Sequence, residues 1–149
     1  MSRPRILITG ASGFIARTLI PRLMDEVDIT LLLLEDFGNG APLPTPLNKI
    51  RAKVDVVYAD LRNFQLTARA LRQARPDRII HLAAVGVSEP FLNVNTALSH
   101  NVTGTINLLR ACFESDNLDV QQVIVARTPG ERTVMNVYAA SKAAAWAFC

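Results

Sequence analysis

The chain has 149 residues, of which 50% are hydrophobic and 19% are charged, and its formal net charge is +3. These values describe one globular domain with a filled core, and the basic residues are too scattered to indicate a nucleic acid partner. No segment approaches the roughly 18 consecutive apolar residues of a membrane span, so no membrane association is expected.

Apolar runs alternate with amphipathic patterns along the whole chain. The apolar runs predict five strands, at 5–9, 28–36, 54–60, 77–84 and 120–126. The intervening patterns predict helices at 13–26, 63–74 and 93–115, followed by an alanine-rich helix at 138–149. Segments rich in Gly, Pro or Asn are expected to be loops, at 37–49 and 127–136.

This alternation predicts an α/β fold with a doubly wound parallel sheet of about five strands, a Rossmann fold. We expect one dinucleotide-binding domain over 1–149. In such sheets ligands bind beyond the carboxyl ends of the strands, where the strand order reverses. The loops that follow the strands are therefore the places where functional residues are expected.

The loop after the first strand reads TGASGFIA (9–16) and contains two glycines before a helix. Glycine lets the backbone turn sharply and approach a ligand, and the N–H groups of a helix N-terminus suit a pyrophosphate. The pattern predicts dinucleotide binding by Gly10, Gly13, Phe14 and Ile15, with a purely structural turn as the alternative.

Acidic residues close the second and third strands. Glu35 lies where a carboxylate can accept hydrogen bonds from the adenosine ribose and repel a 2′-phosphate, which favours NAD over NADP. Asp60 precedes Leu61 at the end of the third strand, where a carboxylate can meet the adenine amino group. A capping role stays open for both acids.

Tyr138 and Lys142 lie four residues apart at the start of the alanine-rich helix and so share one helical face. A neighbouring ammonium stabilises a phenolate, so we expect the pKa of Tyr138 to fall toward neutrality. Such a tyrosine can exchange a proton with a substrate hydroxyl while hydride moves to or from a nicotinamide. A solvated helical face is the alternative, which the dinucleotide turn on the same chain disfavours.

Three further side chains are expected to be structural. His81, at the end of an apolar strand, is expected to be a core residue with satisfied hydrogen bonds. Cys112 and Cys149 lie in apolar helical stretches and are expected to be buried free thiols. Because reduced cysteines are typical of a reducing compartment, and the first residues do not read as a secretory signal, we expect a cytoplasmic protein.

Five segments together resemble one protein family: TGASGFIA, ADL, HLAA, HNVTGTINLLRAC and YAASKAAA. They are similar, in order and over the whole chain, to the extended short-chain dehydrogenase/reductases of the NAD-dependent epimerase/dehydratase family. The resemblance implies NAD as cofactor, a nucleotide sugar as substrate, and a homodimer formed by the helices at 93–115 and 138–149. It implies Tyr138 as the acid/base and Lys142 as the residue that binds the nicotinamide ribose.

The resemblance also implies roles for residues outside the last helix. Thr128, or Thr133 as the alternative, corresponds to the hydroxyl that binds the reacting sugar oxygen. Asn101 corresponds to an asparagine near the active site and is expected to contribute to cofactor binding. The remaining positions that match cofactor-binding residues are Glu35, Asp60, Leu61, Leu82, Ala83 and Ala84. No metal ligand is assigned.

The chain departs from the family pattern in ways that affect the predicted activity. ARTPGE (126–131) replaces a serine-rich run, and the Asp-Glu pair of a dehydratase is missing, which favours an epimerase or a 4-keto reductase. Family members continue well beyond the lysine, so we expect a cofactor-binding part that ends before the substrate domain. Such a part is expected to bind NAD weakly without turning over nucleotide sugars. The alternative is a non-catalytic NAD-binding module or scaffold.

Overall fold

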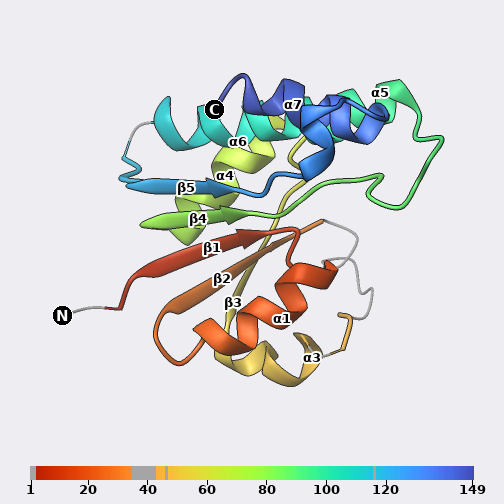
Figure 1. Ribbon diagram of the computed structural model, residues 1–149. Helices are drawn as coiled ribbons and strands as arrows, with labels where there is room; N and C mark the ends of the chain where they lie inside the picture. Colours follow the sequence, from red (N-terminus) through yellow and green to blue (C-terminus); the bar gives the residue numbers. More distant parts are fainter. Residues whose placement is uncertain (1–2, 35–42, 46, 116) are drawn as a thin grey trace.

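A computed structural model describes residues 3–34, 43–45, 47–115 and 117–149 (Figure 1). The strands of this part are β1 (Arg5–Thr9), β2 (Asp28–Leu33), β3 (Asp55–Tyr58), β4 (Arg78–His81) and β5 (Gln122–Val125). The α-helices are α1 (Phe14–Leu23), α3 (Leu47–Ile50), α4 (Phe64–Ala74), α5 (Val94–Ala97), α6 (Gly104–Phe113) and α7 (Val137–Trp146). Two short 3-10 helices, Arg51–Lys53 and Pro129–Arg132, and a π-helical segment, Leu98–Thr103, complete the chain order.

The five strands form one parallel sheet in the order β3-β2-β1-β4-β5. Strand β1 lies between β2 and β4, and its last residue, Thr9, is in register with Leu32 and His81. Helices α1 and α3 lie on one side of the sheet, and α4, α5, α6 and α7 lie on the other (Figure 1). The predicted doubly wound parallel sheet is therefore confirmed, with the strand order reversing at β1 and β4.

The core consists of two layers because successive residues of a buried strand point to opposite faces. Leu7 of β1 packs with Leu71 and Leu108 beneath α4 and α6. Its neighbour Ile8 points the other way and packs with Ile20 of α1 and Leu47 of α3. Burial on both faces explains why the first two strands read as continuous apolar runs.

The structure differs from the predicted elements in three places. The helix predicted over 93–115 contains the π-helical segment, in which the backbone turns more widely than an α-helix. The loop predicted over 37–49 overlaps α3, which is anchored by the buried Leu47. The loop predicted over 127–136 contains the 3-10 helix Pro129–Arg132.

The two cysteines were both expected to be buried. Cys112 is buried, and burial raises its pKa to about 12. Cys149 is exposed, so the expectation is wrong for this residue. Among the described helices, none combines the length and apolarity needed to cross a membrane.

Candidate active site

Two cavities open at the carboxyl ends of the strands, and they share part of their lining. The first, of about 220 Å³, lies over the ends of β2, β3 and β4. The second, of about 780 Å³, extends from the N-terminus of α1 to the loop after β5 and to α7. The residues that line both are Gly10, Gly13, Leu82 and Ala84. The cavities therefore meet where the strand order reverses, the position predicted for ligand binding.

The glycine turn at this junction is built by close backbone approach. Gly10 has a φ of 65°, and a Cβ there would lie 2.6 Å from the Ala83 nitrogen, so a side chain fits neither the conformation nor the space. The Gly13 N–H donates to the Gly10 carbonyl at 2.9 Å, and α1 then begins without a side-chain cap. Phe14 and Ile15 line the second cavity at this helix end. The unpaired N–H groups there suit an anion.

The first cavity contains an ion pair that is not predicted from the sequence. Arg62 binds both carboxylate oxygens of Asp60 through its side chain and donates its backbone N–H at 2.9 Å. The hydrogen bonds from Arg62 hold the pKa of Asp60 below its ordinary value. Leu61 and His100 line the same cavity. Glu35 lies outside the described residues.

The second cavity brings together three of the predicted catalytic residues, Thr128, Tyr138 and Lys142. Helix α7 is positioned by Asn136, whose side chain accepts a hydrogen bond from the Ala139 N–H at 2.8 Å. Lys142 is only 5% exposed, and burial lowers its pKa. Thr133 lies outside this lining, and its hydroxyl donates to the Gly130 carbonyl at 3.3 Å.

The predicted fall in the pKa of Tyr138 is wrong for the chain without cofactor. Burial raises the pKa of Tyr138, and the negative charge of Glu131 raises it further. The larger cause is the partial burial of the phenol, which the four-residue spacing of Tyr138 and Lys142 does not reveal. The sequence does contain a signal for the role of Glu131. Thr128 at the N-cap, Pro129 after it and Glu131 three residues from Thr128 form the pattern of a helix-capping box.

His81 belongs to a buried hydrogen-bond chain next to the cavities. The Thr105 hydroxyl donates to the Asn101 carbonyl at 2.7 Å, so it accepts from His81 Nε2 at 2.9 Å. This network assigns the tautomer, and His81 Nδ1 accepts from the Thr9 hydroxyl at 2.7 Å. Burial lowers the pKa of His81 to about 3, with a smaller contribution from Lys142. The prediction of a satisfied core histidine is confirmed.

Asn101 connects the loop after β4 to α7. Its Oδ1 accepts from the Val85 N–H at 2.9 Å, while its Nδ2 donates to the Val85 carbonyl at 3.0 Å and to the Ser141 hydroxyl at 2.9 Å. The Ser141 hydroxyl donates in turn to the Tyr138 carbonyl at 2.7 Å. Asn101 is 1% exposed and lines neither cavity, whereas Leu82, Ala83 and Ala84 line the first. Through these hydrogen bonds Asn101 joins the loop after β4 to helix α7.

Within the described ranges, no group of three or more His, Cys, Asp or Glu side chains is arranged to hold a metal ion. The second cavity places a glycine turn beside an uncapped helix N-terminus, a buried lysine and a tyrosine on one lining. A phenol and an ammonium on one cavity wall are groups that can move and stabilise a proton.

Comparison with known proteins assigns the family. Residues 6–149 match the model of the NAD dependent epimerase/dehydratase family, and the chain belongs to this family. It is 27% identical over 113 residues to a UDP-glucose 4-epimerase of Azospirillum brasilense. The aligned residues cover 75% of this chain and 31% of that protein. It is also 32% identical over 108 residues to a UDP-glucose 4-epimerase of Mycolicibacterium smegmatis. Here the aligned residues cover 72% of this chain and 34% of that protein.

A solved structure extends the likeness to three dimensions. The Bordetella bronchiseptica enzyme WbmG, crystallised in complex with NAD, matches with a TM-score of 0.78 and 25% identity over 99% of this chain and 49% of that chain. The chain thus spans about a third of the length of the two curated relatives and about half of the WbmG chain.

Proposed function

We propose that the chain binds NAD across the two connected cavities and supplies the cofactor-binding part of an enzyme that acts on a nucleotide sugar. The chemistry proposed is that of an epimerase or a 4-keto reductase. One observation carries the proposal: a continuous lining runs from Asp60, through Gly10 and Gly13, to Tyr138 and Lys142. The family, and relatives named as UDP-glucose 4-epimerases, support it.

The residues present fit such a cofactor. The junction of the cavities is lined by two glycines beside the uncapped N-terminus of α1, which suits a pyrophosphate. Adenosine would then lie in the first cavity beside Asp60 and Leu61, and the nicotinamide riboside in the second, near Lys142. When bound, the nicotinamide supplies the site that accepts or returns hydride.

The protein residues would handle the proton and the substrate hydroxyl. Tyr138 lines the second cavity, where its hydroxyl would exchange a proton with a sugar hydroxyl. The Lys142 ammonium lies on the same wall, where it can bind ribose hydroxyls and favour the phenolate. Thr128 follows β5 and lines the same cavity, which suits a hydrogen bond to the reacting oxygen.

Calorimetric titration with NAD tests the cofactor half of the proposal. We expect measurable binding that is lost in Gly13→Val, because the added side chain fills the pyrophosphate position, and a Cβ at Gly13 already lies 3.0 Å from the Gly10 carbonyl. Gly104→Ala, in α6, is the matched control and is expected to bind like the parent. Circular dichroism would establish that both variants fold. Unchanged NAD binding by a folded Gly13→Val variant would overturn this assignment.

Turnover tests the catalytic half, on the longest polypeptide that the natural coding region supplies. Panels of UDP-, dTDP-, GDP- and CDP-sugars would be assayed for product with the parent and with Tyr138→Phe. We expect conversion of one sugar class that falls by about 100-fold or more in the variant, in line with the loss of a general acid/base. NAD binding without turnover of any sugar would favour the alternative, a non-catalytic NAD-binding module.

A further inference from the structure

The first cavity combines apolar walls with an ion pair. Its lining at the ends of β2 and β3 is largely apolar and includes Leu32, Leu33 and Leu61. The polar side chains on the same lining include the carboxylate of Asp60 and the guanidinium of Arg62, which pair with each other. The cavity therefore offers apolar surface together with hydrogen-bonding groups whose charges are balanced. Such a combination suits a neutral heteroaromatic ring that carries a hydrogen-bond donor.

Arg62 fixes the Asp60 carboxylate through several contacts. Its Nε donates to Oδ1 at 3.0 Å and to Oδ2 at 2.8 Å, and its Nη2 donates to Oδ2 as well. Its backbone N–H donates to Oδ1 at 2.9 Å. A carboxylate can accept about four hydrogen bonds, so these donors leave capacity for a donor that belongs to a ligand.

The backbone that carries this pair is also held in place. The buried Asn107 side chain, on α6, donates to the Leu61 carbonyl at 2.8 Å and to the Arg62 carbonyl at 3.0 Å. The Asn63 N–H donates to the Asp60 carbonyl at 2.9 Å, and Asn63 is the N-cap of α4. Helices α4 and α6 pack side by side (Figure 1). Because backbone and side chain are both fixed, a ligand meets the Asp60 carboxylate in one orientation.

We propose that Arg62 is a positioning residue that sets the base specificity of the site, orienting Asp60 to accept the 6-amino group of adenine and to reject hypoxanthine. Hypoxanthine presents a carbonyl oxygen where adenine presents the amino group, and a fixed carboxylate repels that oxygen. A carboxylate free to turn would instead accept the ring N1–H of hypoxanthine and so bind either base. The contacts between Arg62 and Asp60, and their place on the cavity lining, carry this inference. It rests on the proposed function, which puts adenosine in this cavity.

The test is a calorimetric titration with NAD and with nicotinamide hypoxanthine dinucleotide, in which a carbonyl replaces the 6-amino group. We expect the parent to bind NAD about 10-fold more tightly or better, because the charged acceptor is left facing an oxygen in the analogue. In Arg62→Leu the ratio of the two dissociation constants should fall to about 3 or less, because the freed carboxylate can accept from either base. Arg62→Lys keeps the charge without the planar guanidinium and should give an intermediate ratio. Asp60→Asn should show no preference, because an amide offers both a donor and an acceptor.

The ratio separates base recognition from a general effect on the fold. If Arg62 only stabilised the loop after β3, its loss would weaken both dinucleotides equally and leave the ratio unchanged, which would overturn the proposal. A preference that persists in Asp60→Asn would overturn it as well. Arg72→Leu, at the opposite end of the sheet, is the control and should keep the parent ratio.

Circular dichroism would establish that each variant folds, and Arg62→Lys supplies the reading if Arg62→Leu does not fold. The two proposals fail in different ways. A parent that binds neither dinucleotide would overturn the proposed function and this inference together. A parent that binds NAD and the hypoxanthine analogue equally well would overturn this inference alone.

Discussion

At the scale of single residues, Gly10 lies against backbone atoms that leave no room for another side chain. A Cβ there would lie 2.6 Å from the Ala83 nitrogen, and its φ of 65° is unfavourable for other residues. We expect Gly10→Ala to lower the free energy of unfolding by about 1–3 kcal/mol. Gly104→Ala is the control, since its Cβ meets Leu61 at an ordinary 3.4 Å. Urea unfolding measures both, and equal stability of the two variants would contradict the close approach at Gly10.

His81 gives a prediction about pH. Its pKa is 6.5 when exposed and about 3 when folded, so the unfolded chain binds a proton more readily than the folded chain below pH 6.5. The contribution of His81 is complete above this value and is lost as the pH falls toward 3. Between pH 7 and pH 5 the free energy of unfolding should drop by about 2 kcal/mol. Urea unfolding at the two pH values measures the drop, and His100→Gln should retain it. Equal stability of the parent at both would contradict a buried neutral ring.

The positions of the candidate residues were easier to predict than their electrostatics. The glycines and Asp60 were predicted because they follow strands whose apolar runs are easy to read, and Tyr138 and Lys142 were predicted from their four-residue spacing. The structure places these residues on the lining of the two connected cavities. The pKa of Tyr138 was predicted with the wrong sign, because the burial of its side chain, and to a smaller extent the charge of Glu131, depend on tertiary packing that the spacing of Tyr138 and Lys142 does not encode. Arg62 was missed because its partnership with Asp60 depends on side-chain conformation rather than on spacing.

At the scale of elements, the π-helical segment places Asn101 between the loop after β4 and α7. Removing its side chain leaves the Val85 N–H and carbonyl and the Ser141 hydroxyl without their shared partner. We expect Asn101→Ala to lower the free energy of unfolding by about 2–3 kcal/mol. It should also speed amide hydrogen exchange in α7.

The exposed Asn95 offers a matched control on the preceding helical turn. Asn95→Ala should change the free energy of unfolding by no more than about 0.5 kcal/mol. If Asn101→Ala is as stable as this control and α7 exchanges at the parent rate, the connecting role assigned to Asn101 is wrong.

The elements themselves divide into those that periodicity predicts and those that it does not. The five strands, α1 and α4 were predicted because burial imposes a regular apolar pattern on them, and α7 was predicted from its high alanine content. The π-helical segment was missed because one wider turn leaves the apolar spacing of the long helix almost unchanged. Helix α3 was missed because it is four residues long and depends on the single buried Leu47.

At the scale of the whole molecule, α6 and the residues that follow α7 carry exposed apolar side chains. Phe113 and Phe148 are each 63% exposed, and both line a hollow with Ile106 and Leu109. We expect a homodimer formed through this surface, because apolar groups gathered on one face are typical of interfaces. Sedimentation equilibrium at micromolar concentrations should report a dimer for the parent and a monomer for the double variant Phe113→Ser, Phe148→Ser.

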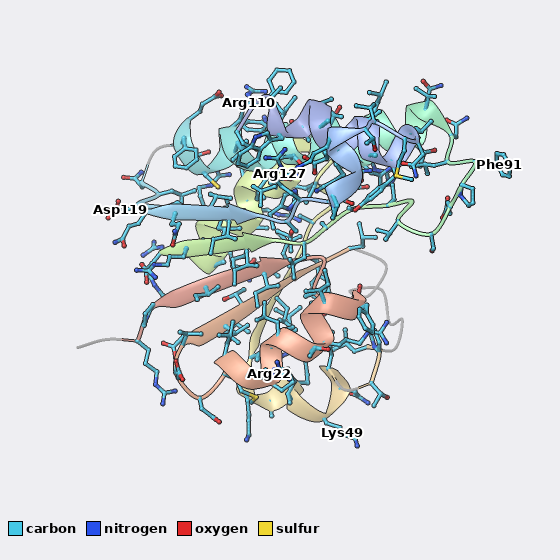
Figure 2. All side chains as sticks on the ribbon, viewed as in Figure 1. Arg22, Lys49, Phe91, Arg110, Asp119 and Arg127 are labelled. Carbon is cyan, nitrogen blue, oxygen red and sulfur yellow. The ribbon has the colours of Figure 1, made fainter. Side chains whose placement is uncertain are left out.

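A control for this surface lies on the loop after β4, where Phe91 projects from the molecule and is 98% exposed (Figure 2). Phe91→Ser should leave the mass unchanged. A parent that sediments only as a monomer, or a double variant that still dimerises, would contradict the proposed interface.

The central claim is that one cofactor site spans both cavities, and an NMR titration of the chain with NAD tests it most directly. Amide signals of Gly10, Gly13, Leu61 and Ala139 should shift together with one binding constant, because these residues line the two cavities. Signals of Arg72, at the opposite end of the sheet, should stay in place. Shifts confined to one cavity, or shifts at Arg72 without any at Gly10 and Gly13, would contradict the claim.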